Sequence, residues 1–280
     1  MRKIKESAPG KLMLFGEHAV VYNQPCLAAA MDKWVTVTTI EKKGEESVFV
    51  KTTRQLFEQK FGAVSVGFRI DGFNSRYGLG SSAAVTVATA KALFKLKNIK
   101  VSQKELFDFC YQVVRKVQEV GSGFDLAASI YGGVIYFVTG GKNIQRLSVQ
   151  KVPLIVGYSG EKADTIKMIK QTAKKINQHF LQQSTKIVNK AKAAMEREDW
   201  LETGRLMNQN QEILKGVGVS TPKLDKMVEA SLKAGAWGGK LSGAGGGDCM
   251  IALTSDNKRM AVEKAIELAG GEIIRVKLSL

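Results

Sequence analysis

The stretch Tyr77-Gly-Leu-Gly-Ser-Ser-Ala-Ala-Val-Thr-Val-Ala88 separates a predicted strand at 64–70 from a small-residue helix that we expect to continue to residue 96. The glycines at positions 78 and 80 let the backbone approach a ligand closely, because neither carries a Cβ. Ser81 and Ser82 fall at the predicted helix start, where unpaired N–H groups and the helix dipole favour an anion. The stretch therefore predicts a phosphate-binding loop, with a plain serine-capped turn as the alternative.

Two common phosphate-binding patterns are excluded for this stretch. No Gly-Lys-Ser/Thr sequence follows its second glycine, as a P-loop requires, and it does not contain the dinucleotide pattern Gly-x-Gly-x-x-Gly. Two further glycine-rich stretches accompany it, at 121–125 and 238–249. We expect the last of these to be a loop that precedes a strand.

Length and composition favour an α+β protein with two domains. The 280 residues, of which 44% are hydrophobic, are enough to bury a sizeable core. Near residue 150 the pattern changes from mixed strands and helices to an almost continuously helical region at 161–215. We therefore predict an N-terminal domain over residues 1–150 and a C-terminal domain over residues 151–280.

Several local features are also predicted from residue type. Pro9-Gly10 is typical of a turn, and the β-branched runs at 34–40 and 47–53 around a polar turn at 42–46 suggest a hairpin. Ser102 with a glutamate three residues later predicts a capped helix. In the long helical region we expect breaks near Ser184 and Asp199.

Composition also indicates location and partners. Three cysteines that lie far apart fit a reduced, cytoplasmic protein and offer no zinc site. No apolar run approaches the roughly 18–20 residues that span a bilayer, so no membrane association is expected. The formal charge of +16 favours anionic small molecules over nucleic acid, because no basic stretch is interleaved with aromatic residues.

Three motifs together resemble the GHMP kinase superfamily over essentially the whole chain. They are Ala8-Pro-Gly-Lys11 with Gly16-Glu-His-Ala-Val-Val-Tyr22, then Tyr77-Gly-Leu-Gly-Ser-Ser-Ala-Ala84, and Lys240-Leu-Ser-Gly-Ala-Gly-Gly-Gly-Asp-Cys249. Within the superfamily, the first motif is most similar to that of mevalonate kinases. The resemblance implies a two-domain fold with the active site between the domains, ATP and Mg²⁺ as cofactors, and phosphoryl transfer to an alcohol.

The resemblance also assigns roles to individual residues. Asp125 matches the aspartate that accepts the proton of the attacking hydroxyl, although on its own it would read as a helix N-cap. Lys11 matches a lysine near that aspartate, where a cation could stabilise charge on the transferred phosphoryl group. Ser82 matches the serine that binds the magnesium ion carried with ATP.

The remaining implied contacts fall on the three motifs. Glu17 and His18 would lie near the substrate, with a structural hydrogen-bonded pair as the alternative. Ser242 is expected to contact the substrate from the second domain. The nucleotide-binding positions implied by the resemblance are Gly78, Leu79, Gly80, Ser81, Ser82, Gly243, Ala244 and Gly245.

The sequence departs from mevalonate kinases in ways that concern the metal and the acceptor. These enzymes usually carry a helix glutamate as a second magnesium ligand, and its place falls at about Val114, with no acid before Glu119. The middle of the chain instead resembles phosphomevalonate kinases, at Arg76-Tyr-Gly78, Gly121-Ser-Gly-Phe-Asp125 and Gly246-Gly-Asp-Cys249.

These observations predict an ATP-dependent kinase that phosphorylates the 5-hydroxyl of mevalonate in isoprenoid biosynthesis. One alternative is a phosphomevalonate kinase, for which Arg69, Arg76 and Lys33 are candidate contacts to the additional phosphate. A second alternative is a catalytically inactive small-molecule-binding protein of the same fold. A homodimer is left open by the sequence.

Overall fold

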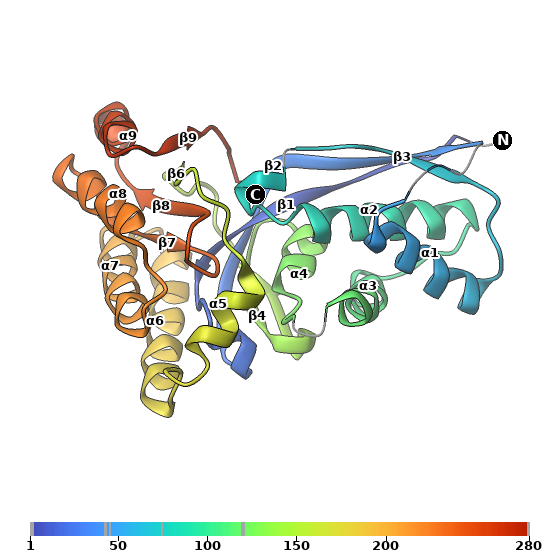
Figure 1. The fold of residues 1–280 in the computed structure, drawn as a ribbon, viewed down its shortest axis with the longest axis horizontal. Coiled ribbons are helices and arrows are strands. Elements are labelled where there is room, and N and C mark those ends of the chain that lie inside the picture. Colours follow the sequence, from blue (N-terminus) through green and yellow to red (C-terminus); the bar gives the residue numbers. More distant parts are fainter. Residues whose placement is uncertain (1–2, 42–43, 45, 74, 119–120, 279–280) are drawn as a thin grey trace.

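The strands of the protein form two antiparallel sheets that lie along the long axis of the molecule (Figure 1). The computed structural model describes residues 3–41, 44, 46–73, 75–118 and 121–278. The first sheet contains β1 (Lys5–Phe15), β2 (Pro25–Ile40), β4 (Val134–Val138) and β5 (Asn143–Arg146) in that order, and β3 (Gly67–Asp71) also pairs with β2. The second sheet has the order β7 (Gly238–Ser242), β8 (Cys249–Leu253), β6 (Leu154–Tyr158) and β9 (Glu272–Ile274).

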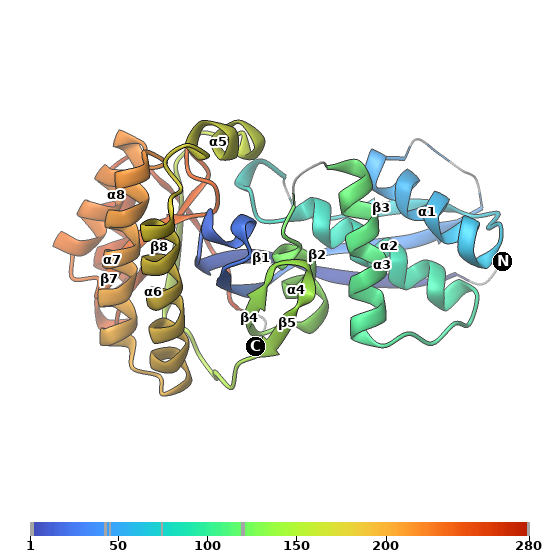
Figure 2. The same ribbon diagram turned by 90° about the horizontal axis from the view of Figure 1, so that it is seen from below.

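Helices pack on each sheet, which confirms the α+β class. The first sheet is covered by α2 (Ser81–Leu96) and α4 (Phe124–Tyr131), and α1 (Val48–Phe61) and α3 (Gln103–Val117) pack on these helices. The second part of the chain contributes α5 (Thr165–Thr172), α6 (Gln178–Glu196), α7 (Trp200–Val217), α8 (Pro222–Lys233) and α9 (Arg259–Leu268). Figure 2 shows α6 and α7 side by side, with α5 lying near the junction of the two parts.

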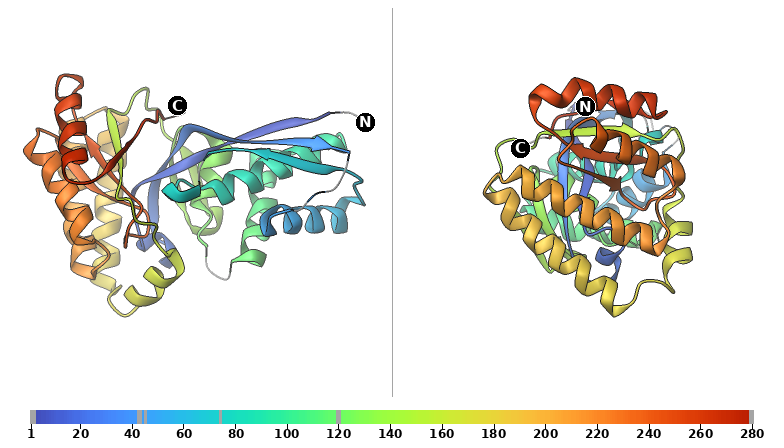
Figure 3. Two further views of the ribbon diagram at one scale, coloured as in Figure 1. Left: turned by 45° about the horizontal axis from the view of Figure 1, so that its top comes forward. Right: turned by 90° about the vertical axis from the view of Figure 1, so that its left-hand side faces the viewer.

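Apolar side chains join the two parts. Alternate residues of the second sheet point to opposite faces, so that Ile155, Met250 and Ala252 pack with residues of α8 and α9. Figure 3 shows the backbone of this sheet and its helices from two further directions. Their neighbours Val156 and Ile251 face the other way, into a cluster that also contains residues of β1, β2 and α6. The two parts therefore share one buried interface. None of the described helices is long and apolar enough to cross a membrane.

Local capping explains where several helices begin. The predicted capping box is present: Ser102 Oγ accepts from the N–H of Glu105, whose side chain accepts from the N–H of Ser102. The break expected near Asp199 is confirmed: α6 ends at Glu196, and the Asp199 side chain caps α7 through the N–H of Glu202. The break expected near Ser184 is wrong, because that residue lies inside α6. The chain instead breaks at 173–177, where the Asn177 side chain caps α6 through the N–H of Phe180.

The hairpin predicted from 34–40 and 47–53 is wrong. The first run is the end of the long strand β2, but the second belongs to α1, where Ser47 Oγ accepts from the N–H of Val50. β-branched residues disfavour a helix only weakly, and here the cap and the burial of Val50 and Phe57 outweigh that preference. Positions 42, 43 and 45 of the expected polar turn lie outside the described residues.

Two other expectations of irregular structure are corrected. Pro9-Gly10 does not form a turn, because β1 continues through it with a register shift against β2 between Pro9 and Lys11. A bulge of this kind accommodates a proline that has no N–H to donate. The stretch at 238–249 is not entirely a loop either: its first five residues form the fully buried strand β7.

Glycines on α7 supply a matched test of the packing between α7 and β7. A Cβ added at Gly204 would lie 2.6 Å from the backbone carbon of Trp237, whereas at Gly216 it would meet nothing within 4 Å. We expect Gly204→Ala to destabilise the protein by about 2 kcal/mol through overpacking. Gly216→Ala should stabilise it by roughly 0.5–1 kcal/mol through helix propensity. Urea denaturation of both variants measures this, and effects of the same sign would contradict the packing.

Candidate active site

The three motifs meet at a cavity between the two parts of the chain. The cavity has a volume of about 360 Å³, within the range of small-molecule sites, and residues of both parts line it. Nine of the predicted site residues are among the lining residues: Lys11, His18, Gly78, Gly80, Ser81, Ser82, Asp125, Gly243 and Ala244.

The glycine loop and the start of α2 form one wall. Gly80, at φ +79°, is the N-cap of α2 and places Ser81 and Ser82 in its first turn. The loop is held against β1, where the N–H of Lys11 donates to Leu79 O at 2.9 Å. Because the first N–H groups of a helix have no partner within it, this wall offers donors and a positive dipole end to an anion.

Lys11 extends along the same loop toward the start of α4. Its aliphatic stem packs on Gly80, where an added Cβ would lie 2.6 Å from Lys11 Cγ. Its ammonium group donates to Gly78 O at 3.1 Å and lies 5.3 Å from the ring centroid of Phe124. Within the described part of the chain, no carboxylate forms an ion pair with it under 4.0 Å, so its charge faces the cavity.

Asp125 lies in the first turn of α4 beside this lysine. The N-cap of α4 is Gly123, at φ +90°, so the N-cap interpretation of Asp125 is wrong. One carboxylate oxygen, Oδ1, accepts from the N–H of Leu126 at 2.9 Å. This bond fixes the orientation of a half-buried carboxylate that lines the cavity.

His18 reaches the cavity from the turn after β1. Its φ is positive, at +59° with ψ −45°, which is uncommon for a residue other than glycine. Its ring lies between Ala244 O, 2.8 Å from Nε2, and Thr172 Oγ1, 3.3 Å from Nδ1. Because a carbonyl only accepts, Nε2 carries a proton and donates. Burial lowers the pKa of His18, with the Ala244 bond and the charge of Glu17 opposing this.

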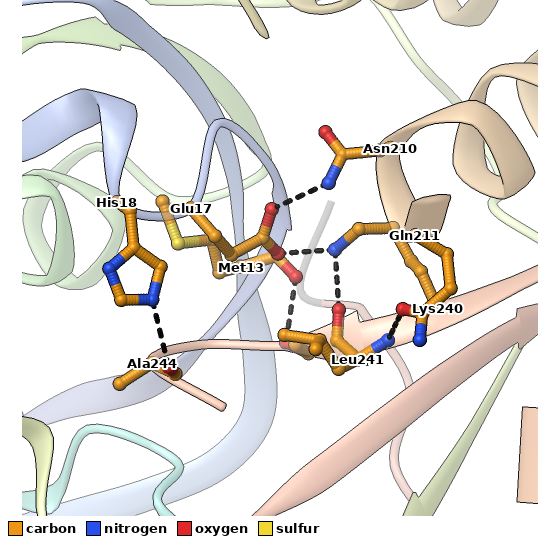
Figure 4. Close-up of polar contacts among 9 residues, drawn as sticks. Met13, Glu17, His18, Asn210, Gln211, Lys240, Leu241 and Ala244 are labelled. Atoms are coloured by element: carbon orange, nitrogen blue, oxygen red, sulfur yellow. Dashed lines mark hydrogen bonds and ion pairs between the residues drawn. The ribbon is translucent and has the colours of Figure 1, made fainter. Parts of the chain in front are cut away.

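Four predicted residues do not line the cavity. Glu17 is buried in an ion pair with Lys240, and Ser242 Oγ donates to Met13 O at 2.7 Å (Figure 4). Leu79 is buried in the apolar cluster between the two parts, and Gly245 packs against the backbone of the residue at 219. Glu17 and His18 do not form the alternative hydrogen-bonded pair either, because Glu17 bonds Lys240 and Asn210 whereas His18 bonds Ala244 and Thr172.

Two charged residues at the cavity were missed. Asp248 follows a run of glycines and has φ +56°, with Oδ1 accepting from the N–H of Ala163 at 3.1 Å. Burial raises the pKa of Asp248, and the hydrogen bond from Ala163 opposes this. Lys162, on the segment between β6 and α5, lines the cavity near it. An acidic residue directly after a run of glycines is the feature of the sequence that could have indicated Asp248 as a site residue. Nothing in the sequence distinguishes Lys162 from the other lysines.

Oxygen donors in the cavity suit a hard cation such as Mg²⁺. Ser82, Asp125 and Asp248 all line it, whereas Val114 occupies the place of the expected helix glutamate with a buried apolar side chain. Within the described ranges, no group of three or more His, Cys, Asp or Glu residues could hold a metal ion alone. These residues fit an ion that keeps waters and phosphate oxygens as ligands. Glu119 lies outside the described residues.

Comparison with family models matches both parts of the chain. Residues 48–133 match the model of the GHMP kinases N-terminal domain, and residues 191–270 match that of the GHMP kinases C-terminal domain. The chain belongs to the GHMP kinase family.

Relatives of this GHMP kinase cover its whole length. The mevalonate kinase of Pyrococcus abyssi is 33% identical over an alignment that spans 99% of this chain and 96% of the relative. Among solved structures, the phosphomevalonate kinase of Streptococcus pneumoniae has a TM-score of 0.90 at 24% identity, covering 99% of this chain and 100% of its own. The L. major mevalonate kinase in complex with R-mevalonate has a TM-score of 0.83 at 24% identity, covering 99% and 96%. The two structural likenesses show the fold alone.

The lowered pKa of His18 predicts a pH dependence of stability. Because the folded pKa lies below the unfolded value of 6.5, the unfolded chain binds more protons between the two values. The free energy of unfolding should therefore fall as the pH decreases below about 6.5.

Urea denaturation at pH 7.5 and pH 5.5 measures this loss. This loss of stability should shrink in His18→Asn, because asparagine, like histidine, occurs at positive φ more often than most residues. It should persist in His179→Asn, which changes the exposed second histidine. The raised pKa of Asp248 changes the stability with pH in the opposite sense. Because this contribution is the same in all three proteins, it cancels when their losses are compared. Equal losses in all three proteins would contradict the assignment to His18.

Proposed function

We propose that this GHMP kinase transfers the γ-phosphoryl group of ATP to the 5-hydroxyl of mevalonate, as an enzyme of isoprenoid biosynthesis. The observation that carries the proposal is the convergence of Asp125, Lys11 and the loop at 78–82 on one cavity. A general base, a cation and an anion-binding helix start are what phosphoryl transfer to an alcohol requires. A cytoplasmic location, a homodimer and the domain boundary near residue 150 stay predictions from the sequence.

Each residue has a defined task in this reaction. Asp125 accepts the hydroxyl proton as the oxygen forms its bond to the γ-phosphorus, while the bond from phosphorus to the departing ADP breaks. Lys11 faces the same space and stabilises negative charge on the transferred group. The N–H groups at the start of α2 bind the nucleotide phosphates and fix them in line with the acceptor.

Ser82 would hold Mg²⁺ together with the nucleotide phosphates. When bound, the ion neutralises part of the phosphate charge. Asp125 and Asp248 are the described acids that line the cavity, and both are suited to orient waters on such an ion.

The charges of the cavity support mevalonate over its phosphorylated form. Among the described residues that line the cavity, the side chains with a permanent positive charge are Lys11 and Lys162. The three residues suggested for an additional phosphate, Arg69, Arg76 and Lys33, are not among them. Arg76 instead binds Glu272 at 2.9 Å, and Arg69 pairs with Asp71 at 3.4 Å. The full-length relatives at 32–33% identity are mevalonate kinases.

A comparison of two acceptors tests the substrate. With ATP and Mg²⁺ present, we expect turnover of mevalonate and a kcat/KM for 5-phosphomevalonate that is lower by at least about 100-fold. The reason is that Arg69, Arg76 and Lys33 lie outside the cavity lining, which leaves Lys162 as the one described lysine or arginine there besides Lys11 for an additional phosphate. Release of ADP in separate reactions measures both constants. Turnover of the phosphorylated acid alone would assign the protein to the other reaction.

Asp125→Asn tests the general base. The variant keeps an oxygen for the Leu126 bond, so we expect nucleotide binding to change less than about threefold while kcat falls by about 10²–10⁴-fold. Asp108→Asn, on α3 outside the cavity lining, is the matched control and should keep wild-type kcat. Unchanged kcat in Asp125→Asn would contradict the assigned role. A wild type that binds ATP without turnover of either acceptor would favour the inactive alternative.

A further inference from the structure

A buried ion pair between Glu17 and Lys240 lies at the junction of the two parts and has no role in the chemistry described above (Figure 4). Glu17 lies in the turn that follows β1, and Lys240 is the central residue of β7. Both side chains are fully buried, which is rare for charged residues and costs solvation of both groups.

The two charges are held by bonds to three separate elements. The Lys240 ammonium group donates to Glu17 Oε1 and to Leu241 O. The other carboxylate oxygen of Glu17 accepts from Asn210 Nδ2, on α7, at 3.3 Å. Burial lowers the pKa of Lys240, and the charge of Glu17 opposes this shift. The pair therefore joins the turn after β1 to both β7 and α7.

The segments that carry the pair continue directly into the cavity wall. The residue after Glu17 is His18, which lines the cavity and bonds Ala244 O at 2.8 Å. On the other segment, β7 ends at Ser242, whose Oγ bonds Met13 O, and Gly243 and Ala244 then line the cavity. Three polar contacts thus connect the segment at 13–18 to the third motif, and the ion pair is the most buried of them.

We propose that Glu17 and Lys240 form a positioning pair, which sets the placement of the wall at 243–244 against the wall formed by Lys11 and Asp125. Neither residue touches a substrate, and the inference rests on the proposed kinase function. The hydrogen bonds of the ion pair are directional and are satisfied at one relative placement of the two segments, whereas the burial of the surrounding apolar side chains is not directional. In-line phosphoryl transfer depends on such placement, so the pair acts on kcat.

A purely stabilising role is a weaker explanation for this pair. Replacing a buried ion pair by uncharged side chains of similar volume is often neutral or stabilising, while removing one partner strands a buried charge. The two roles therefore predict different behaviour when both charges are removed together.

Single and double variants separate the two roles. Lys240→Met alone leaves Glu17 unpaired, and we expect its melting temperature to fall by about 10 °C. The double variant Glu17→Gln with Lys240→Met leaves no buried charge, so its melting temperature should return to within about 3 °C of wild type. The exposed pair on α3 supplies the control: Lys104→Met should change neither melting temperature nor kcat.

The deciding readout is the kcat of the folded double variant. A positioning role predicts that kcat stays about 100-fold below wild type although the melting temperature has recovered. Recovery of kcat together with stability would overturn the proposal. If the double variant stays less stable than wild type, its kcat is measured at a temperature at which circular dichroism shows that it is folded. A kcat equal to that of wild type at this temperature would also overturn the proposal.

Amide hydrogen exchange keeps this test separate from the proposed function. Peptides that cover 16–20 and 240–248 should exchange faster in the double variant than in wild type, with or without turnover. If wild type acts on neither acceptor, the kinase proposal fails, but faster exchange confined to these peptides still supports the role of the ion pair in holding the two segments together. Unchanged exchange in these peptides would overturn that role whatever the activity.

Discussion

The cavity depends on a close approach between β1 and the glycine loop that leaves no room for side chains. A Cβ at Gly10 would lie 2.7 Å from Leu79 O, and one at Gly80 would lie 2.6 Å from Lys11 Cγ. At this separation the N–H of Lys11 bonds the loop directly, and its ammonium group bonds the loop again at Gly78 O. The cation and the helix start are thereby fixed to each other by backbone contacts, before any ligand arrives.

A second constraint comes from the interface between the two parts. Residues of β1 and β2 share an apolar cluster with the second sheet, so the first motif is anchored on both sides of the junction. The hydrogen bonds near the cavity are directional, whereas the burial of apolar side chains in this cluster is not. We infer that the apolar cluster supplies most of the stabilisation between the two parts, and that the polar contacts select one arrangement of the parts. The formal net charge of +16 favours the approach of anionic ligands to the protein as a whole.

Much of this arrangement was predictable from residue type, for identifiable reasons. The glycine loop, the start of α2 and the cap of α3 are local features, because their neighbours in sequence decide them. The α+β class and the GHMP kinase family followed from motifs that are contiguous in sequence. In contrast, α1 contains β-branched residues, and its burial against the core, which local preference does not encode, decides its helical state.

The polar contacts across the junction of the two parts could not be predicted from the local sequence. Glu17 and His18 are adjacent in sequence, and both were expected at the substrate. The positive φ of His18 accompanies a turn in which these neighbours face different surroundings. His18 faces the cavity, and Glu17 faces Lys240, 223 residues away along the chain. Asp248 shows the same limit, since its place beside Gly78 depends on a contact between the second and third motifs. Sequence motifs identify which residues gather at such a site, whereas the fold determines which of them face the ligand and which bind one another.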